Sequence, residues 1–506
     1  MNSRARRSDA GLLGAVLGTL LVCPTSAQAF ESEVEATSEA QFYTYQSPYG
    51  EPLIRRRRYT ETLALHVYDL QGEGVPGKPR LSLKTRLRLD ADFGQEARER
   101  NPESESYVPG LEQAPLDVMY AYLEGRDYAG GYLGFRIGRQ YVTDVLGWWS
   151  FDGGLVSLTT PAYLEFQAYG GFEQRSGVPL LGRNRFEADG VMRGNRDGLE
   201  LDQDTSYLAE SKLAPAYGAA VETAGLHFLH ARLSYRKVIN RDTVVVSPFP
   251  VPPSGGLYVV GGDRVSSERA GGSLRVDIGR LGTLYGNAVY DLYNQLLPEY
   301  ALGLDAYATS RITLGADYEY YQPTFDADSV FNWFAHQGMS TVRGRASVAF
   351  TRRLDAALSG GVRRFNTEGD PETYAATGNI EQTGVEVDPF ATLGARYRWT
   401  DGNVGLSSMA ELGDRGHRVG GDVTTRKYFD NGYWDTLLVL SLYDWQDDLR
   451  PTREATSFSY VVGAGVSPGL EFIGKGRLGV EWEHAINDLV GQRYRVLATL
   501  GLSFYQ

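Results

Sequence analysis

Positively charged residues at alternate positions are the feature of this sequence whose type and spacing could do chemistry. In "LSLKTRLRLDADF" (81–93), lysine and arginine alternate with leucine and threonine. Because successive side chains of a β-strand point to opposite faces, such a strand has one apolar and one charged face. Arginine stays charged and binds carboxylate or sulfate through paired hydrogen bonds, so the pattern predicts a surface that attracts anions. The residues expected on this surface are Lys84, Arg86, Arg88, Arg136, Arg139, Arg343, Arg345, Arg396, Arg398, Arg493 and Arg495.

Motifs for catalysis or metal binding find little support. Gly465-Val-Ser467-Pro-Gly469 matches the G-x-S-x-G pattern, but it closes a strand before a hairpin, whereas a nucleophile elbow needs a strand-to-helix turn. His227 and His230 are three apart on a strand and face opposite sides, so they cannot share a metal. The acidic stretch 200–204 is interpreted as a solvated loop rather than a weak Ca²⁺ site. We therefore expect no enzyme, no catalytic residue, no metal site and no cofactor.

The elements that position the charges are strands, because a period of two dominates from end to end. After residue 30 no stretch approaches 18 consecutive apolar residues, which excludes spanning helices there, and the chain has 33 tyrosines and 60 glycines. This composition is typical of a transmembrane β-barrel. The sequence predicts an all-β fold, an antiparallel transmembrane β-barrel of about 18–22 strands.

Short and long connections alternate along the chain, as in a barrel with tight turns at one end and long loops at the other. The short turns are expected at 160–161, 224–225, 309–310, 401–402 and 431–432, and the longer connections at about 94–114, 140–152, 174–211, 240–265, 323–340 and 366–386.

Energy decides which face of each strand meets lipid. Turning Lys84, Arg86 and Arg88 toward the membrane would cost roughly 2–4 kcal/mol each near its midplane. The charged faces are therefore expected to line a water-filled lumen. Acidic residues such as Asp90, Asp317 and Glu483 share these faces. One interpretation is a cationic path for anions; the other is that the charges neutralise one another and stiffen the wall.

The two chain ends carry export and assembly signals. Residues 1–29 combine early arginines, an apolar run and Ala27-Gln28-Ala29, which predicts a signal peptide followed by a barrel over 30–506. Its removal would take away Cys23, the single cysteine, and change the formal net charge from −13 to −15 through loss of three arginines and one aspartate. Such an acidic chain is not expected to bind nucleic acid. "VLATLGLSFYQ" resembles the C-terminal strand that the barrel-assembly machinery reads, so we expect the bacterial outer membrane and its lipid as surroundings.

Residues 135–158, "FRIGRQYVTDVLGWWSFDGGLVSL", resemble a segment of outer-membrane porins and alginate-export-type barrels. The match consists of Gly138-Arg139-Gln140, Trp148-Trp149 and Phe151-Asp152-Gly153, with a tighter spacing than in that family. The resemblance implies a channel whose constriction is lined by Arg139 with Asp152. An alternative is that these two residues pair structurally across a hairpin.

Three functions remain open from the sequence. The first is export of a hydrophilic, anionic polysaccharide, which would require a periplasmic polysaccharide-export protein as partner. The second is a general diffusion porin for small solutes. The third is a non-conducting scaffold or adhesion barrel whose loops, such as 174–211 and 247–256, bind partners.

Overall fold

The computed structural model describes sixteen segments of the chain. They are residues 31–46, 52–71, 78–92, 116–174, 185–186, 192–193, 214–240, 245–251, 256–260, 263–324, 338–366, 385–413, 416–447, 454–470, 474–489 and 491–505. The predicted signal peptide (1–29) and the acidic stretch 200–204 lie outside the described residues.

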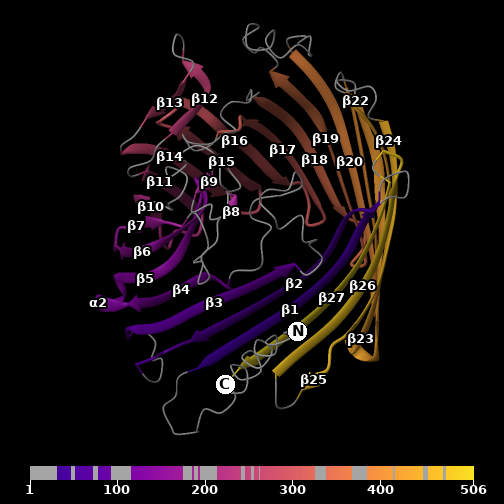
Figure 1. The fold of residues 1–506 in the computed structure, drawn as a ribbon, viewed down its shortest axis with the longest axis horizontal. Helices are drawn as coiled ribbons and strands as arrows, with labels where there is room; N and C mark the ends of the chain where they lie inside the picture. Colours follow the sequence, from indigo (N-terminus) through magenta and orange to yellow (C-terminus); the bar gives the residue numbers. More distant parts are fainter. Residues whose placement is uncertain are drawn as a thin grey trace, which may run out of the picture.

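Twenty-two antiparallel strands form one closed barrel, which confirms the predicted fold class (Figure 1). The last strand pairs with the first from Glu33↔Tyr505 to Gln46↔Gln492, so the sheet has no free edge. No helix among the described residues is long and apolar enough to cross a membrane. The strands of the wall are β1 (Ser32–Gln46), β2 (Pro52–Val67), β3 (Arg80–Asp92), β4 (Leu116–Asp127), β5 (Leu133–Asp144), β6 (Gly147–Thr159), β7 (Leu164–Glu173), β10 (Pro215–Thr223), β11 (Leu229–Asn240), β14 (Arg264–Asp277), β15 (Gly282–Asp291), β16 (Leu296–Tyr307), β17 (Ile312–Tyr321), β18 (Met339–Ala349), β19 (Leu354–Asn366), β20 (Val385–Trp399), β21 (Gly402–Gly413), β22 (Gly416–Phe429), β23 (Trp434–Asp447), β24 (Glu454–Val466), β26 (Gly474–Asn487) and β27 (Gly491–Tyr505).

Five short strands and two short helical turns accompany the wall in the described part of the chain. The pairs β8 (Arg185–Phe186) with β9 (Met192–Arg193), and β12 (Val245–Val251) with β13 (Gly256–Val260), are small separate sheets. The fragment β25 (Gly469–Leu470) pairs with β26 beyond the end of β24. The turns α2 (Tyr128–Gly131) and η4 (Asp430–Gly432) connect β4 to β5 and β22 to β23.

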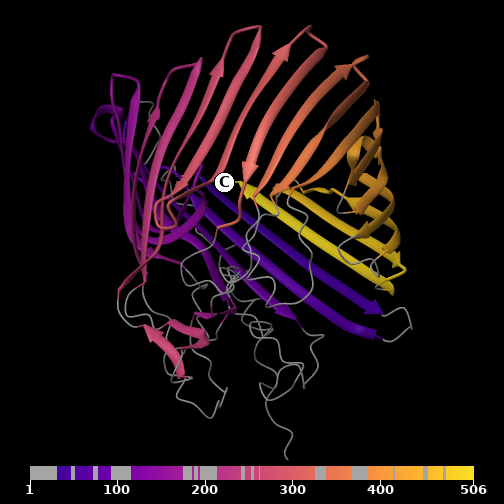
Figure 2. The ribbon, with the colours of Figure 1, turned by 90° about the horizontal axis from the view of Figure 1, so that it is seen from above.

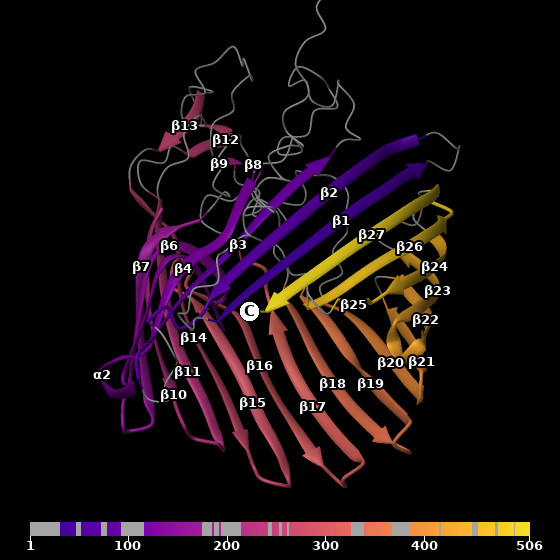
Figure 3. The same ribbon diagram turned by 90° about the horizontal axis from the view of Figure 1, so that it is seen from below.

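The predicted tight turns lie together at one end of the barrel (Figure 2). The turns at 160–161, 224–225, 309–310, 401–402 and 431–432 each join two adjacent wall strands there. The opposite end carries β12 and β13 (Figure 3). The predicted loop over 140–152 is wrong, because β5 runs to Asp144 and β6 begins at Gly147, so these residues form a strand hairpin.

The two faces of the wall follow the predicted alternation. On β18, Val342 is 55% exposed on the outside, whereas its neighbours Arg343 and Arg345 bond to acidic side chains on the inside. Leu302, Leu358 and Leu393 continue the apolar outer surface on β16, β19 and β20. This surface is what contact with lipid requires.

Aromatic side chains flank the apolar outer surface at both ends. Phe350 and Trp434 are exposed near the end with the tight turns. Toward the other end, the Tyr300 and Tyr320 rings stack with centroids 5.1 Å apart. Such belts place amphipathic rings at the two membrane–water interfaces.

Candidate functional site

The β5–β6 hairpin leaves the wall at the end of the barrel opposite the tight turns. Pairing of β4 with β5 stops at Ala121↔Arg139, and pairing of β6 with β7 stops at Phe151↔Glu173, whereas β5 and β6 stay paired to Asp144↔Gly147. The tip of the hairpin, residues 140–150, therefore has no wall strand beside it in the sheet. We call this segment the inward hairpin, because of where its tip lies.

The tip lies on the inner face of strands that are not its sheet neighbours. Arg236 of β11 donates a hydrogen bond of 2.8 Å from Nη2 to the Leu146 carbonyl oxygen. Arg236 is inward-facing because its neighbour Leu233 is 64% exposed on the opposite, outer face. Gly271 of β14 lies under the tip, since a Cβ there would come within 2.9 Å of Val145 Cγ1 and of Leu146 Cδ2. The hairpin thus crosses the inner face of β7 and β10 to reach β11 and β14.

An aromatic cluster packs between the inward hairpin and the wall. The Trp149 and Phe151 rings stack with centroids 4.4 Å apart, and Tyr169 of β7 packs against both. Trp149 Nε1 donates to Glu173 Oε1 at 3.0 Å, and the Arg236 guanidinium lies 5.3 Å from the Trp149 ring. Phe151 is fully buried. A small apolar core inside the barrel therefore fixes the inward hairpin.

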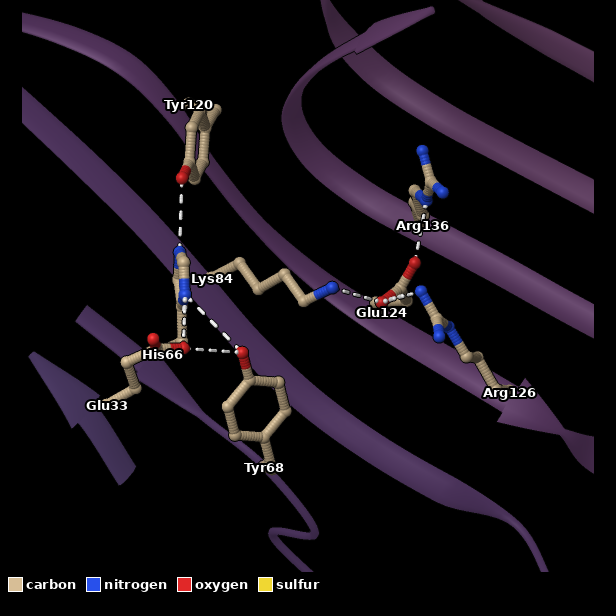
Figure 4. Close-up of polar contacts among 8 residues, drawn as sticks. All are labelled: Glu33, His66, Tyr68, Lys84, Tyr120, Glu124, Arg126 and Arg136. Carbon is tan, nitrogen blue, oxygen red and sulfur yellow. Dashed lines mark hydrogen bonds and ion pairs between the residues drawn. The ribbon is translucent and has the colours of Figure 1, made fainter. Parts of the chain in front are cut away.

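The charges on the inner wall are arranged around shared carboxylates. Glu124 of β4 accepts from Lys84 at 2.8 Å, and from Arg126 and Arg136 at 2.9 Å each (Figure 4). Only 5% of the Glu124 side chain is exposed. Close by, His66 Nε2 lies 3.1 Å from the Tyr120 hydroxyl, so polar contacts continue across β2, β3 and β4 (Figure 4).

The same arrangement, one carboxylate with two arginines, recurs around the barrel. Asp317 lies within 3.0 Å of both Arg343 and Arg345, and Asp305 is 3.0 Å from Arg345. Asp355 with Arg396 and Arg398, and Glu483 with Arg493 and Arg495, repeat this arrangement, and Asp117 forms an ion pair with Arg88. Among the residues predicted to form an anion path, all but Arg86 have an ion pair with a carboxylate in the described part of the chain, and Arg86 lies opposite Tyr120 in the strand register. The inner wall is therefore of mixed charge.

Arg139 and Asp152, the two residues expected at a constriction, bind each other. Arg139 donates from Nε and Nη2 to the two Asp152 carboxylate oxygens at 2.7 Å, and from Nη1 to the Val118 carbonyl at 3.1 Å. Arg139 is 9% exposed and Asp152 47%. By alternation the pair lies on the face of β6 opposite Phe151, at the point where the inward hairpin leaves β4. The structure thus places the pair at the root of the hairpin.

Arg88 and Arg495 share one sector of the wall but lie at different levels along its strands. Their strands, β3 and β27, are separated only by β1 and β2. Arg88 pairs with Thr62, which faces Thr37 of β1, whereas Arg495 faces Tyr43. Six residues along β1 separate the two levels, about 20 Å at the usual rise of a strand. The arginines of this sector do not form one contiguous cluster.

A row of small and hydroxyl side chains, which the sequence reasoning missed, lines the inner wall on the other side. Ser407 donates to Asp422 at 3.0 Å and Tyr443 donates to the same carboxylate at 2.5 Å. A concavity of about 640 Å³ opens on this row, lined also by Ser359 and Thr392. The register places these members of the row side by side: Thr313, Ser347, Ala357, Gly394, Ser407, Asp422, Ser441 and Ser459.

Metal chemistry finds no support in the described part of the chain, where no group of three His, Cys, Asp or Glu side chains could hold an ion.

Comparison with known proteins supports the fold. No protein-family model and no curated protein sequence matches this chain. Among solved structures, the siderophore receptor PirA from Pseudomonas aeruginosa superposes with a TM-score of 0.51 at 10% identity, over 95% of this chain and 81% of the receptor. OccAB1 from Acinetobacter baumannii (TM-score 0.40, 10% identity, 94% of this chain and 96% of that one) and OpdK from Pseudomonas aeruginosa, solved with vanillate (0.39, 9%, 94% and 99%), are also similar.

At these identities the similarity concerns the fold. The closed barrel with its apolar outer surface is that of a bacterial outer-membrane β-barrel. The alginate-export-type resemblance of residues 135–158 gains no support from these matches.

Proposed function

We propose that this protein is an outer-membrane pore for small hydrophilic solutes, narrowed by the inward hairpin. The observation that carries the proposal is the seating of the hairpin tip, through Arg236 and Gly271, across the inner face of a closed barrel. A segment fixed in this way reduces the open cross-section without closing it by a separate domain. Loops that narrow a wide barrel are a general way to turn it into a size-limited channel.

The chemistry of the inner wall supports passage of neutral or weakly charged solutes. Most arginines of the described inner wall are offset by a carboxylate, as with Glu124 and Asp317. The serine and threonine row offers hydroxyls that exchange hydrogen bonds with water or solute. Many weak contacts let a solute enter and leave, whereas a few strong ones would trap it.

Export of an anionic polysaccharide remains the alternative that the arginine pattern first favoured. For that function, the arginines must act as anion sites even though ion pairs with Asp355, Glu483 and other acids already occupy them. The pairing favours the small-solute pore. A scaffold or adhesion function would place its binding surface on the loops, most of which lie outside the described residues.

Conductance of the refolded barrel in a planar lipid bilayer, under a salt gradient, tests the proposal. A small-solute pore gives ohmic steps, weak ion selectivity and no block by a soluble polyuronate. Strong anion selectivity with concentration-dependent polyuronate block would instead favour polysaccharide export. An absence of current from correctly folded barrels would favour the scaffold function.

A further inference from the structure

A carboxylate lies on the outer face of the barrel, within its apolar surface. Glu61 of β2 pairs in register with Ser38 of β1, which faces Leu500 of β27, which in turn faces Leu478 of β26. Leu500 and Leu478 are 38% and 47% exposed and belong to the lipid-facing side. Because residues paired across antiparallel strands share a face, Glu61 points outward as well.

The carboxylate lies at about half the height of the membrane. It is six residues from Val67, the end of β2 at the turn side. At about 3.4 Å per residue and a tilt near 45°, six residues rise about 14 Å, whereas the apolar band of such barrels is about 25 Å tall. Leu63 lies below Glu61 on the same face, and Leu89 of β3 faces it. Lipid chains are therefore the default surroundings.

The two hydrogen bonds to Glu61 reach the same carboxylate oxygen. Ser38 Oγ donates to Glu61 Oε2, and the Tyr59 hydroxyl donates to the same oxygen at 2.6 Å. Among the described contacts of this side chain, Oε1 accepts no hydrogen bond. Hydrocarbon cannot supply a donor, and a polar group without one is costly there. The outer wall thus contains a carboxylate oxygen that needs a hydrogen-bond donor.

We propose that the surface formed by Ser38, Tyr59 and Glu61 is where a second copy of this chain packs in the membrane. Copies related by an axis along the membrane normal present the same residues at equal depth, so each brings two hydroxyls to the other's carboxylate. If Tyr59 of one copy donates to Oε1 of its partner while Ser38 keeps Oε2, every carboxylate oxygen receives one donor. Ala36 and Ala40 flank Ser38 on β1, and small residues let two walls approach closely.

Cross-linking of single-cysteine variants tests this contact in lipid. With Cys23 replaced by serine the chain has no cysteine. Ala40→Cys then places a thiol beside the proposed contact, since Ala40 pairs with Tyr59. Leu302→Cys on β16 is the matched control, because Leu302 is 60% exposed and β16 lies eleven strands from β1 around the ring. Both variants are reconstituted in vesicles and treated with a flexible bis-maleimide.

The expected result is a dimer band for Ala40→Cys and a monomer band for Leu302→Cys. Adding Glu61→Leu to Ala40→Cys should weaken association about tenfold, as loss of a hydrogen bond to a charged group does, whereas Glu61→Gln keeps an acceptor and the dimer. The shift of the folded barrel on an unheated gel confirms that each variant folds. Equal cross-linking at both sites, no dimer at Ala40→Cys, or a band containing a different protein would overturn the proposal.

Discussion

Releasing the inward hairpin should widen the pore. Arg236 is 7% exposed and makes two contacts with the hairpin: the hydrogen bond to the Leu146 carbonyl and the cation–π contact with Trp149. A hydrogen bond to a charged group contributes about 1.5–3 kcal/mol, and a desolvated cation–π contact about 2 kcal/mol. Arg236→Met keeps most of the side-chain volume and removes both contacts.

A loss of about 3 kcal/mol or more lowers the ratio of seated to released hairpin at least a hundredfold. The assay is single-channel recording of the refolded variant in a planar bilayer, together with hydrogen exchange over residues 140–150. We expect a larger conductance state and faster exchange of the hairpin amides. Arg477→Gln, which removes an ion pair with Asp435 on the far side of the wall, is the control and should leave both unchanged. An unchanged conductance despite faster exchange would refute the idea that the hairpin limits the pore.

Four further predictions concern other contacts of the barrel. Gly271→Val, which places side-chain atoms against Val145 and Leu146, should raise conductance as Arg236→Met does, because it unseats the tip from the other side; the same recordings check this. Glu124→Gln leaves Lys84, Arg126 and Arg136 without their shared carboxylate, so the reversal potential should shift toward anion selectivity. The free energy of unfolding should fall by about 1–3 kcal/mol, which a urea titration measures as a lower midpoint. Arg139→Ala should destabilise the barrel by a similar amount, since Asp152 and the Val118 carbonyl lose their donor, with little change in selectivity; a selectivity shift larger than that of Glu124→Gln would contradict the structural role. In the turn between β20 and β21, the hydrogen bond from Lys427 holds the pKa of Asp401 below its usual value. The pair therefore stabilises the fold fully above the ordinary pKa of aspartate, and this stabilisation is lost as the pH falls through the lowered pKa. NMR titration of the Asp401 carboxyl follows this change.

The strands and their faces could be predicted from the sequence, because alternation is a local property. The pattern around Lys84, Arg86 and Arg88 fixes which side chains meet water without any knowledge of the neighbouring strands. The tight turns at 160–161 and 401–402 were predicted for the same reason: Asp-Gly and similar pairs form a turn by themselves.

The inward hairpin could not be predicted, because its position depends on distant contacts. Leu146 bonds to Arg236, ninety residues away, and Gly271 is further still. Locally, the stretch 140–152 combines glycine, tryptophan and serine, which favours a loop. Val142, Trp149 and Phe151 have something to pack against only when β7, β10 and β11 supply an inner surface.

The ion pairs of the inner wall depend on register, which alternation leaves open. Arg345 reaches Asp305, which lies two strands away, and Arg363 bonds to Glu411 on a strand that is two positions further round. The sequence showed that acids and arginines share the lumen but not which would meet. The register also separates Arg88 from Arg495, whose strands are close but whose levels along those strands differ.

The most direct test of the account is the conductance of the unmodified barrel in a planar bilayer under a salt gradient, with a soluble polyuronate titrated in. A pore with a charge-balanced wall and a seated hairpin predicts stable ohmic steps, a reversal potential near zero and currents that the polyuronate leaves unchanged. A strongly anion-selective current that falls as polyuronate is added, or no current from folded barrels, would contradict it.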